Sequence, residues 1–182
     1  MKILITGVAG FIGFNIAKEL INRGYEIIGV DVINDYYDVN LKKRRLSKLN
    51  DKNFTFCKID ISDKEKVSEV FKKEKPEIVL HLAAQAGVRY SLINPDQYIK
   101  SNIVGFFNII DQCRLLKIKN FYYASSSSVY GNNANYPFDE EDKVDEPLNL
   151  YAVSKKSNEE MAYAYSNLYN INCIGLRFFT VY

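Results

Sequence analysis

Short apolar runs alternate along the chain with stretches of helical spacing, and this alternation predicts an α/β fold. Apolar runs typical of strands covered on both faces occupy residues 1–6, 26–30, 54–59, 77–83, 120–125 and 173–178. Apolar residues at helical spacing predict helices over residues 15–23, 41–49, 62–75, 94–117 and 150–169. Because alternating strands and helices build parallel sheets, we expect one domain over residues 1–182: a doubly wound sheet of about six parallel strands with helices on both faces.

Local signals mark the ends of three of these helices. Gly24 is expected to stop the first helix. Ser62 and Glu65 have the spacing of a capping box and predict a helix that starts at Ser62. Pro95 stands at a position that the first turn of a helix tolerates, so a long helix is expected from Asn94 onward.

Three glycines, Gly7, Gly10 and Gly13, join the first strand to the first helix. Positions without side chains let the backbone turn tightly, approach a pyrophosphate and pack the helix close to the sheet. The N–H groups at the start of that helix would then face the phosphates. An ordinary glycine-rich turn is the alternative, but the flanking strand, helix and acidic residue favour a dinucleotide site.

Asp31 lies at the tip of the second predicted strand, 18 residues after Gly13. A carboxylate at this place can accept hydrogen bonds from both hydroxyls of an adenosine ribose. It would also repel a 2′-phosphate. The sequence therefore predicts NAD, rather than NADP, as the cofactor.

A second group of polar residues follows the fifth predicted strand. Tyr151 and Lys155 are one helical turn apart and share a face. We expect the Lys155 ammonium to lower the pKa of the Tyr151 phenol, which would make it a base near neutral pH. Ser126, in a serine run at the end of the strand, could bind the same substrate hydroxyl. An isolated pair of this kind is usually an exposed helix pair, but its place after this strand favours catalysis.

Composition narrows the class of protein. The 182 residues are enough for a well-buried domain, with 47% apolar and 25% charged residues and a net charge of +2. This balance favours neither disorder nor a nucleic-acid surface. The basic cluster at 42–45 is interpreted as a solvated helix face rather than a phosphate site. No apolar run approaches the length of a membrane span.

The cysteines and the single histidine bear on metal binding and on cellular location. Cys57, Cys113 and Cys173 are far apart in the sequence, and His81 is the one histidine, so we expect no metal site. Buried free thiols in a cytoplasmic protein fit this pattern better than a zinc site or a disulfide framework. His81 lies in a predicted buried strand, and we expect it to have a structural role.

Taken together, the motifs resemble the extended short-chain dehydrogenase/reductase superfamily. They are Gly7-x-x-Gly10-x-x-Gly13, Asp60-Ile61, His81-Leu82-Ala83-Ala84, Ser126-x-x-Val129-Tyr130-Gly131 and Tyr151-x-x-x-Lys155. The resemblance implies that NAD stays bound and that Ser126, Tyr151 and Lys155 are catalytic. It also implies cofactor contacts for Gly7, Gly10, Phe11, Ile12, Gly13, Asp31, Asp60, Ile61, Leu82, Ala83, Ala84, Asn102, Tyr151 and Lys155.

Three stretches, residues 34–41, 83–91 and 177–182, further resemble nucleotide-sugar 4-epimerases that act on UDP-glucuronate. The resemblance implies that Tyr151 takes the proton of the sugar 4-hydroxyl while a hydride leaves C4 for NAD. The 4-keto sugar would then rotate, and the hydride would return to its opposite face. An epimerase of the UDP-glucose type and a non-catalytic dinucleotide-binding module are the alternatives.

The serine run separates possible reactions within the superfamily. Sugar 4,6-dehydratases carry Thr-Asp-Glu where this chain has Ser126-Ser127-Ser128, and UDP-glucuronate decarboxylases carry glutamate at the position of Ser128. This chain has no carboxylate in the serine run, so it lacks the acid/base group that dehydration or decarboxylation would use. We expect Ser127, Ser128 and Thr180 to hold the substrate carboxylate by neutral hydrogen bonds. Arg89 could equally meet the uronate or a phosphate, or hold its own loop.

The resembled proteins continue beyond the point that corresponds to Tyr182, through a smaller domain that grips the nucleotide sugar. We therefore expect that substrate domain to be missing here, in either a fragment or a naturally short form. The helices at 94–117 and 150–169 form the usual dimer surface of the superfamily, and their many apolar positions fit a homodimer. Neither a nucleic acid nor a membrane is expected as a partner.

Overall fold

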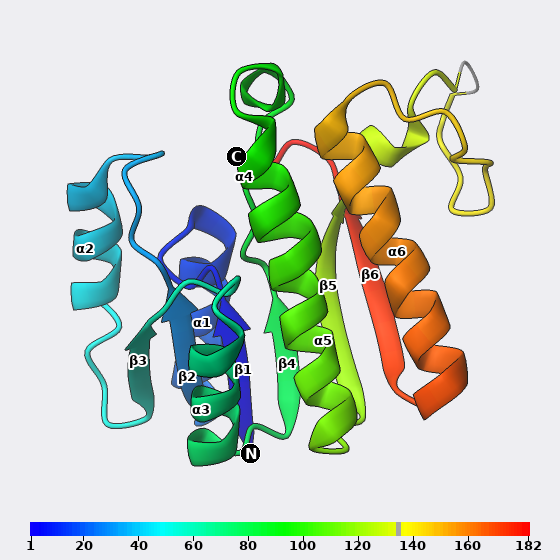
Figure 1. Ribbon diagram of the computed structural model, residues 1–182. Helices are drawn as coiled ribbons and strands as arrows, with labels where there is room; N and C mark the ends of the chain where they lie inside the picture. The colour runs from blue at the N-terminus through cyan, green and yellow to red at the C-terminus, as the bar shows by residue number, and fades with distance from the viewer. Residues whose placement is uncertain (134–135) are drawn as a thin grey trace.

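A computed structural model describes residues 1–133 and 136–182, and it contains one six-stranded sheet in the order β3-β2-β1-β4-β5-β6. Every neighbouring pair of strands is parallel, which confirms the predicted doubly wound sheet (Figure 1). The strands are β1 (Lys2–Thr6), β2 (Glu26–Asp31), β3 (Phe54–Lys58), β4 (Ile78–His81), β5 (Asn120–Ser126) and β6 (Asn172–Phe178).

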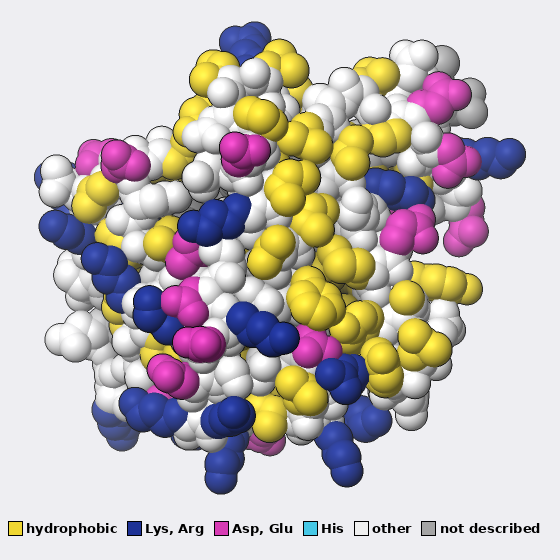
Figure 2. Space-filling model, in the orientation of Figure 1, with side chains coloured by type: hydrophobic (Ala, Val, Ile, Leu, Met, Phe, Trp, Pro, Cys, Tyr) yellow, Lys and Arg dark blue, Asp and Glu magenta, His cyan; other side chains and the backbone are white. Residues whose placement is uncertain are grey.

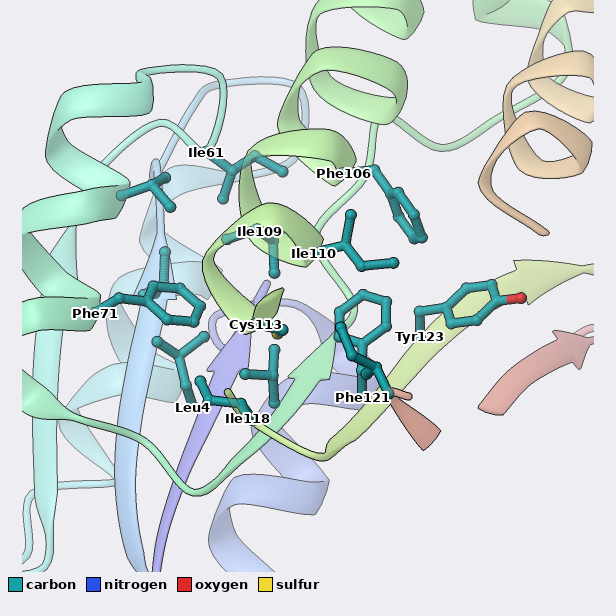
Figure 3. Close-up of a cluster of buried hydrophobic side chains, with 14 of the residues drawn as sticks. Leu4, Ile61, Phe71, Phe106, Ile109, Ile110, Cys113, Ile118, Phe121 and Tyr123 are labelled. Atoms are coloured by element: carbon teal, nitrogen blue, oxygen red, sulfur yellow. The ribbon is translucent and has the colours of Figure 1, made fainter. Parts of the chain in front are cut away.

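Helices cover both faces of this sheet. They are α1 (Phe11–Asn22), α2 (Val39–Ser47), α3 (Lys64–Glu74), α4 (Pro95–Tyr98), α5 (Gly105–Leu115) and α6 (Leu150–Tyr169). Figure 1 shows α3, α5 and α6 in front of the sheet. In Figure 3, Phe71 of α3 and Ile109 and Ile110 of α5 meet Leu4 and Phe121 of the sheet in a buried cluster. A second cluster packs α1 and the end of α2 against the other face.

The order of the strands reverses between β1 and β4, which are neighbours in the sheet. In such sheets the loops that leave the carboxyl ends of the strands on either side diverge, and this opens a crevice for a ligand. The glycine turn follows β1, Leu82 to Gln85 follow β4, and Ser127 to Tyr130 follow β5. The candidate residues therefore gather at one edge of the sheet.

The structure corrects the expected starts of two helices. The first helix begins at Phe11 and so includes Gly13, because Gly10 already occupies the N-cap. The helix expected from Ser62 is capped by Asp63, whose carboxylate accepts a hydrogen bond from the Lys66 N–H. The Ser62 hydroxyl instead donates to Asp60 at 2.8 Å.

The helix expected over 94–117 is divided by a six-residue π-helical segment, Ile99–Val104, which lies between α4 and α5. Segments of this kind often occur at functional sites, because the wider turn displaces individual backbone carbonyls. Gly105 follows the π segment. A side-chain carbon at this position would lie 2.7 Å from the Ile61 Cδ1, so glycine lets α5 approach the loop after β3.

Candidate active site

The turn between β1 and α1 is too tightly packed for side chains. Gly7 has a φ of +72°, and a Cβ there would lie 2.9 Å from the Ala83 N–H nitrogen. A Cβ on Gly13 would lie 2.3 Å from the Gly7 carbonyl oxygen. The N–H groups of Phe11, Ile12 and Gly13 open α1, where helix geometry provides no intrahelical acceptor. A bare backbone with available donors fits a phosphate group.

Asp31 closes one side of this turn. Its carboxylate is 8% exposed and accepts hydrogen bonds from the N–H of Ala9 at 3.1 Å and of Ile33 at 2.9 Å. The Lys42 ammonium is 3.9 Å from the same carboxylate. Each carboxylate oxygen has a second lone pair that can accept a ribose hydroxyl. Asp31 therefore lies where the sequence predicted it, over the glycine turn at the end of β2.

The basic cluster is not simply the solvated helix face that we expected. Lys42 is only 7% exposed, and its ammonium donates to the side chain of Asn34 at 2.7 Å. The Arg45 guanidinium donates to the Ala9 carbonyl at 3.2 Å and lies 5.8 Å from the centre of the Phe11 ring. These two cations turn inward because α2 packs beside the glycine turn. Lys42 thus holds the loop after β2, and Arg45 holds the glycine turn.

Thr6, which the sequence analysis did not single out, organises the segment after β4. Its buried hydroxyl oxygen accepts hydrogen bonds from the N–H groups of Leu82 at 3.1 Å and of Ala83 at 3.0 Å. The hydroxyl hydrogen is then left for the Nδ1 of His81, at 2.8 Å. Burial lowers the pKa of His81 to about 3, so its ring is neutral. His81 has the structural role that we expected, and Leu82 to Ala84 border the crevice.

Asp60 and Ile61 follow β3 on the outer side of the crevice. Burial acts to raise the pKa of Asp60, but hydrogen bonds from Ser62 and from the Lys100 ammonium leave it below its ordinary value. The Ile61 carbonyl accepts from the Asn108 amide at 3.0 Å. Their expected contacts with the cofactor remain predictions.

Tyr151 and Ser126 meet where α6 passes the end of β5. Burial raises the pKa of Tyr151, and the nearby Ser126 hydroxyl partly offsets this rise. Ser126 is 7% exposed, and its hydroxyl oxygen also accepts from the Ser128 N–H at 3.1 Å. The hydroxyl hydrogen can still be donated toward Tyr151 or a substrate. The structure thus brings the predicted serine and tyrosine together.

Lys155 does not lower the pKa of Tyr151 here, contrary to our expectation. Its ammonium donates to the Ala124 carbonyl at 2.8 Å and lies 6.0 Å from the centre of the Tyr151 ring. Lys155 is 3% exposed, and burial lowers its own pKa to about 8. The expectation failed because burial disfavours charge on both side chains, whereas helical spacing alone indicates only their proximity.

A buried polar network holds α6 against the π segment. Asn102 is 1% exposed, and its amide group donates to Ser154 at 2.9 Å and bonds both backbone groups of Gln85. Ser154 in turn donates to the Tyr151 carbonyl at 2.7 Å. The Asn102 carbonyl accepts from the Asn158 amide at 2.7 Å. The side chain of Asn102 thus serves internal bonds, and its predicted cofactor contact remains untested.

The four residues expected to bind the substrate differ in how closely the structure places them to Tyr151 and Ser126. Ser127 and Ser128 are half-buried in the short 3₁₀ turn after β5. Thr180 is exposed beyond β6, but Phe178 pairs in register with Ser126, so Thr180 and Ser128 leave adjacent strands at the same level. The Arg89 side chain is exposed in the loop after β4. The structure thus places Ser127 and Ser128 directly after β5, and Thr180 two residues beyond the end of β6.

Several residues that shape the site went unrecognised in the sequence. Tyr36 and Tyr98 both donate hydrogen bonds to the Ala86 carbonyl, each at 2.9 Å. Ser154 and Asn158 hold α6, the helix that carries Tyr151. The spacing of Ser154 and Asn158 from Tyr151, three and seven residues, was an available signal, since such residues share one helix face. For Tyr36 the available signal was its place in the stretch 34–41, which the sequence analysis had already set apart.

Neither a membrane-spanning helix nor a cluster of metal ligands is found among the described residues. Within residues 1–133 and 136–182, no helix is long and apolar enough to cross a membrane. In the same residues, no three potential ligands among His, Cys, Asp and Glu gather as a metal site would require. The carboxyl end of the sheet thus presents a tight glycine turn after β1 and a buried phenol near a serine after β5.

Comparisons with known proteins agree with this geometry. A family model described as GDP-mannose 4,6 dehydratase matches residues 4–182. The protein CapI of Staphylococcus aureus is 59% identical over 182 residues, which are 100% of this chain and 54% of that protein. A probable UDP-glucuronate 4-epimerase of Rhizobium meliloti is 46% identical over 183 residues, again 100% of this chain and 54% of that protein.

Solved structures show the same fold. A UDP-glucuronic acid 4-epimerase from Bacillus cereus, in complex with UDP-glucuronic acid and NAD, has a TM-score of 0.89 and 34% identity, and the match covers 100% of this chain and 57% of that one. A UDP-glucose 4-epimerase from Brucella ovis, in complex with NAD, has a TM-score of 0.85 and 30% identity over 98% of this chain and 52% of that one. This chain spans about half the length of the curated relatives that it matches. Because the family model matches nearly every residue and the fold agrees, the chain belongs to the GDP-mannose 4,6 dehydratase family.

Proposed function

We propose that residues 1–182 form the NAD-binding and catalytic unit of a nucleotide-sugar 4-epimerase that converts UDP-glucuronate to UDP-galacturonate. The observation that carries this proposal is the meeting of Tyr151 and Ser126 at the same sheet edge as the glycine cradle. A module that only bound a dinucleotide would need the cradle but not this buried pair. The relatives from Rhizobium meliloti and Bacillus cereus support the choice of UDP-glucuronate.

The crevice fits NAD at several points. The turn at Gly7 to Gly13 would hold the pyrophosphate, and Asp31 would accept the adenosine ribose hydroxyls. Leu82 to Ala84 would border the nicotinamide half, and Lys155 would hold its ribose. When bound, NAD supplies a reversible two-electron oxidation of the sugar at C4.

Tyr151 and Ser126 transfer the proton and orient the sugar hydroxyl. The Tyr151 Oη takes the proton from the 4-hydroxyl oxygen and gives it back when the hydroxyl forms again. Ser126 donates to the same substrate oxygen and keeps it beside the phenol. Burial raises the pKa of Tyr151, so the phenolate that accepts this proton depends on the positive charge that oxidised NAD would bring beside it. The sugar must turn within the site so that both faces of C4 reach the cofactor.

Neutral donors would hold the substrate carboxylate. Ser127 and Ser128 lie one and two residues beyond Ser126, and Thr180 leaves the neighbouring strand at the same level. A 4-keto uronate is a β-keto acid, which loses CO₂ when its carboxylate bond aligns with the ketone π-system. Fixing the carboxylate out of that alignment would preserve it. Arg89, whose side chain is exposed, would meet the uronate or a phosphate of the substrate.

Proton NMR of the products tests this proposal. The protein is incubated with NAD and either UDP-glucuronate or UDP-glucose, and the signals of the C4 epimers are followed. We expect UDP-galacturonate from the first substrate, little product from the second, and none with Tyr151→Phe. Turnover of UDP-glucose alone would transfer the assignment to the UDP-glucose class, to which several structural neighbours belong. Bound NAD without either epimer would favour the non-catalytic module.

We also propose that the chain pairs with a second copy through the helices at 94–117 and 150–169. Exposed apolar side chains on these helices include Val104, Phe107, Leu115, Val153, Tyr163 and Leu168. Figure 2 shows a band of apolar side chains over α5 and α6. Sedimentation should therefore report a dimer that Phe107→Glu dissociates; a wild-type monomer would refute the pairing.

A further inference from the structure

A tyrosine of the loop after β2 bonds to the loop after β4. The Tyr36 hydroxyl donates to the Ala86 carbonyl at 2.9 Å, across 50 residues of sequence. Tyr36 also packs against Tyr90, with ring centres 4.8 Å apart. The two loops leave different strands, and neither the cofactor contacts nor the catalytic residues proposed above require this bond.

The order of the strands places this bond above the crevice. β1 lies between β2 and β4, and the glycine turn begins at the carboxyl end of β1. A segment that runs from the end of β2 to the loop after β4 must therefore cross the end of β1. The segment Val32 to Asp38, with Tyr36 as its contact, thus forms a bridge over the place where the phosphates of a dinucleotide would lie.

The bridge is fixed at both ends. At its start, the Ile33 N–H donates to Asp31, and the Asn34 side chain accepts from Lys42 at 2.7 Å. At its far end, the fit is close: Gly87 has a φ of +95°, and a Cβ there would lie 2.7 Å from the Tyr36 hydroxyl. Burial raises the pKa of Tyr36, so its hydroxyl remains a donor at neutral pH.

We infer that Tyr36 is a positioning residue that closes the segment 32–38 over the dinucleotide crevice and thereby slows the release of NAD. The inference rests on the proposed cofactor but not on the proposed sugar. An epimerase gains from such closure, because the oxidised sugar and the cofactor must stay together until C4 is reduced again. Release requires the bridge to open, so the Tyr36 bond contributes to the barrier for release.

The test measures how fast NADH leaves the full protein without any sugar nucleotide. Bound NADH is displaced by excess NAD, and its fluorescence is followed over time. Tyr36→Phe removes only the bridging hydroxyl. Tyr98→Phe is the matched control, because the Tyr98 hydroxyl bonds the same loop, at the Ala86 and Gly87 carbonyls, from α4 on the same side of the crevice. Tyr25→Phe, just before β2 at the opposite end of the sheet, controls for the substitution itself.

We expect release to be about two- to tenfold faster in Tyr36→Phe, the range that one lost hydrogen bond implies, and within twofold of wild type in both controls. Hydrogen exchange should show that NADH protects the amides of 84–93 in the wild type but less in Tyr36→Phe. Equal release rates in wild type and Tyr36→Phe, or equal acceleration by Tyr98→Phe, would overturn the inference. A wild-type protein that does not bind NADH would overturn the proposed cofactor and the inference with it, whereas bound NADH without epimerase activity would overturn only the proposed reaction.

Discussion

Among single residues, Tyr151 and Lys155 are both governed by burial, which acts in opposite directions on their pKa values. The pKa of the phenol is raised and that of the ammonium is lowered to about 8, because each side chain is less stable in its charged form inside the protein. A base that must lose its proton in such surroundings depends on nearby positive charge. The catalytic geometry therefore costs folding stability, and this cost can be measured.

Replacing Lys155 by Met should stabilise the protein near neutral pH. The lowering of the Lys155 pKa from 10.5 to about 8 means that folding disfavours the charged form of this side chain by about 3 kcal/mol. Between these two values the unfolded chain binds a proton that the folded chain does not, so wild-type stability rises with pH across that window. Below pH 8 the full penalty applies, and Lys155→Met should be the more stable protein by up to about 3 kcal/mol.

The measurement is urea unfolding from pH 7 to pH 10.5, with Lys156→Met as the control. Lys156 is the neighbouring residue and pairs with Glu160 on the surface. The difference between wild type and Lys155→Met should shrink as the pH rises, whereas Lys156→Met should show no such trend. A constant difference would mean that Lys155 is not buried as a charge.

We predict that the residue at position 128 decides whether the substrate keeps its carboxylate. Ser128→Glu would place an acidic side chain in the 3₁₀ turn after β5, beside Ser126. We expect this variant to release CO₂ from UDP-glucuronate and to form a UDP-pentose, detected by mass spectrometry. Ser128→Ala, which removes the hydroxyl without adding a carboxylate, should not. An absence of the pentose would count against our account of this position, although not against epimerisation.

Among the elements, the π segment and α6 form a single support for Tyr151 and Lys155. The π segment presents the Asn102 carbonyl to Asn158, and the Asn102 side chain reaches the Tyr151 backbone through Ser154. Apolar spacing predicted both helices, since each buries a stripe of side chains against the sheet. It did not predict the π segment, because one extra residue in a turn leaves the apolar pattern nearly unchanged.

Removing the Asn158 amide should therefore destabilise this support. Asn158→Ala leaves the Asn102 carbonyl buried without that donor, which costs about 1–3 kcal/mol. Asn167→Ala is the control, because its amide bonds the Tyr163 carbonyl on the exposed side of the same helix and its loss should cost less than about 0.5 kcal/mol. Denaturant midpoints measure both. Equal midpoints for the two variants would show that the Asn158 bond adds nothing to the support.

For the molecule as a whole, the sequence predicted what depends on pattern and missed what depends on long-range contact. The parallel sheet, the glycine turn and the place of Asp31 follow from spacing along the chain. The inward turn of Lys42 and the Tyr36 bridge do not, because each joins segments whose distance is set only by the folded sheet. The predicted shift of the Tyr151 pKa had the wrong direction for the same reason, because the fold and not a local motif determines how deeply a side chain is buried.

The proposed reaction removes hydrogen from C4 and returns it without loss to solvent, and an isotope label tests this most directly. UDP-glucuronate carrying deuterium at C4 is converted in ordinary water, and the product is examined by NMR. The account predicts UDP-galacturonate that retains its deuterium at C4, and none with Tyr151→Phe. Loss of the label to water, or an equal yield from Tyr151→Phe, would contradict it.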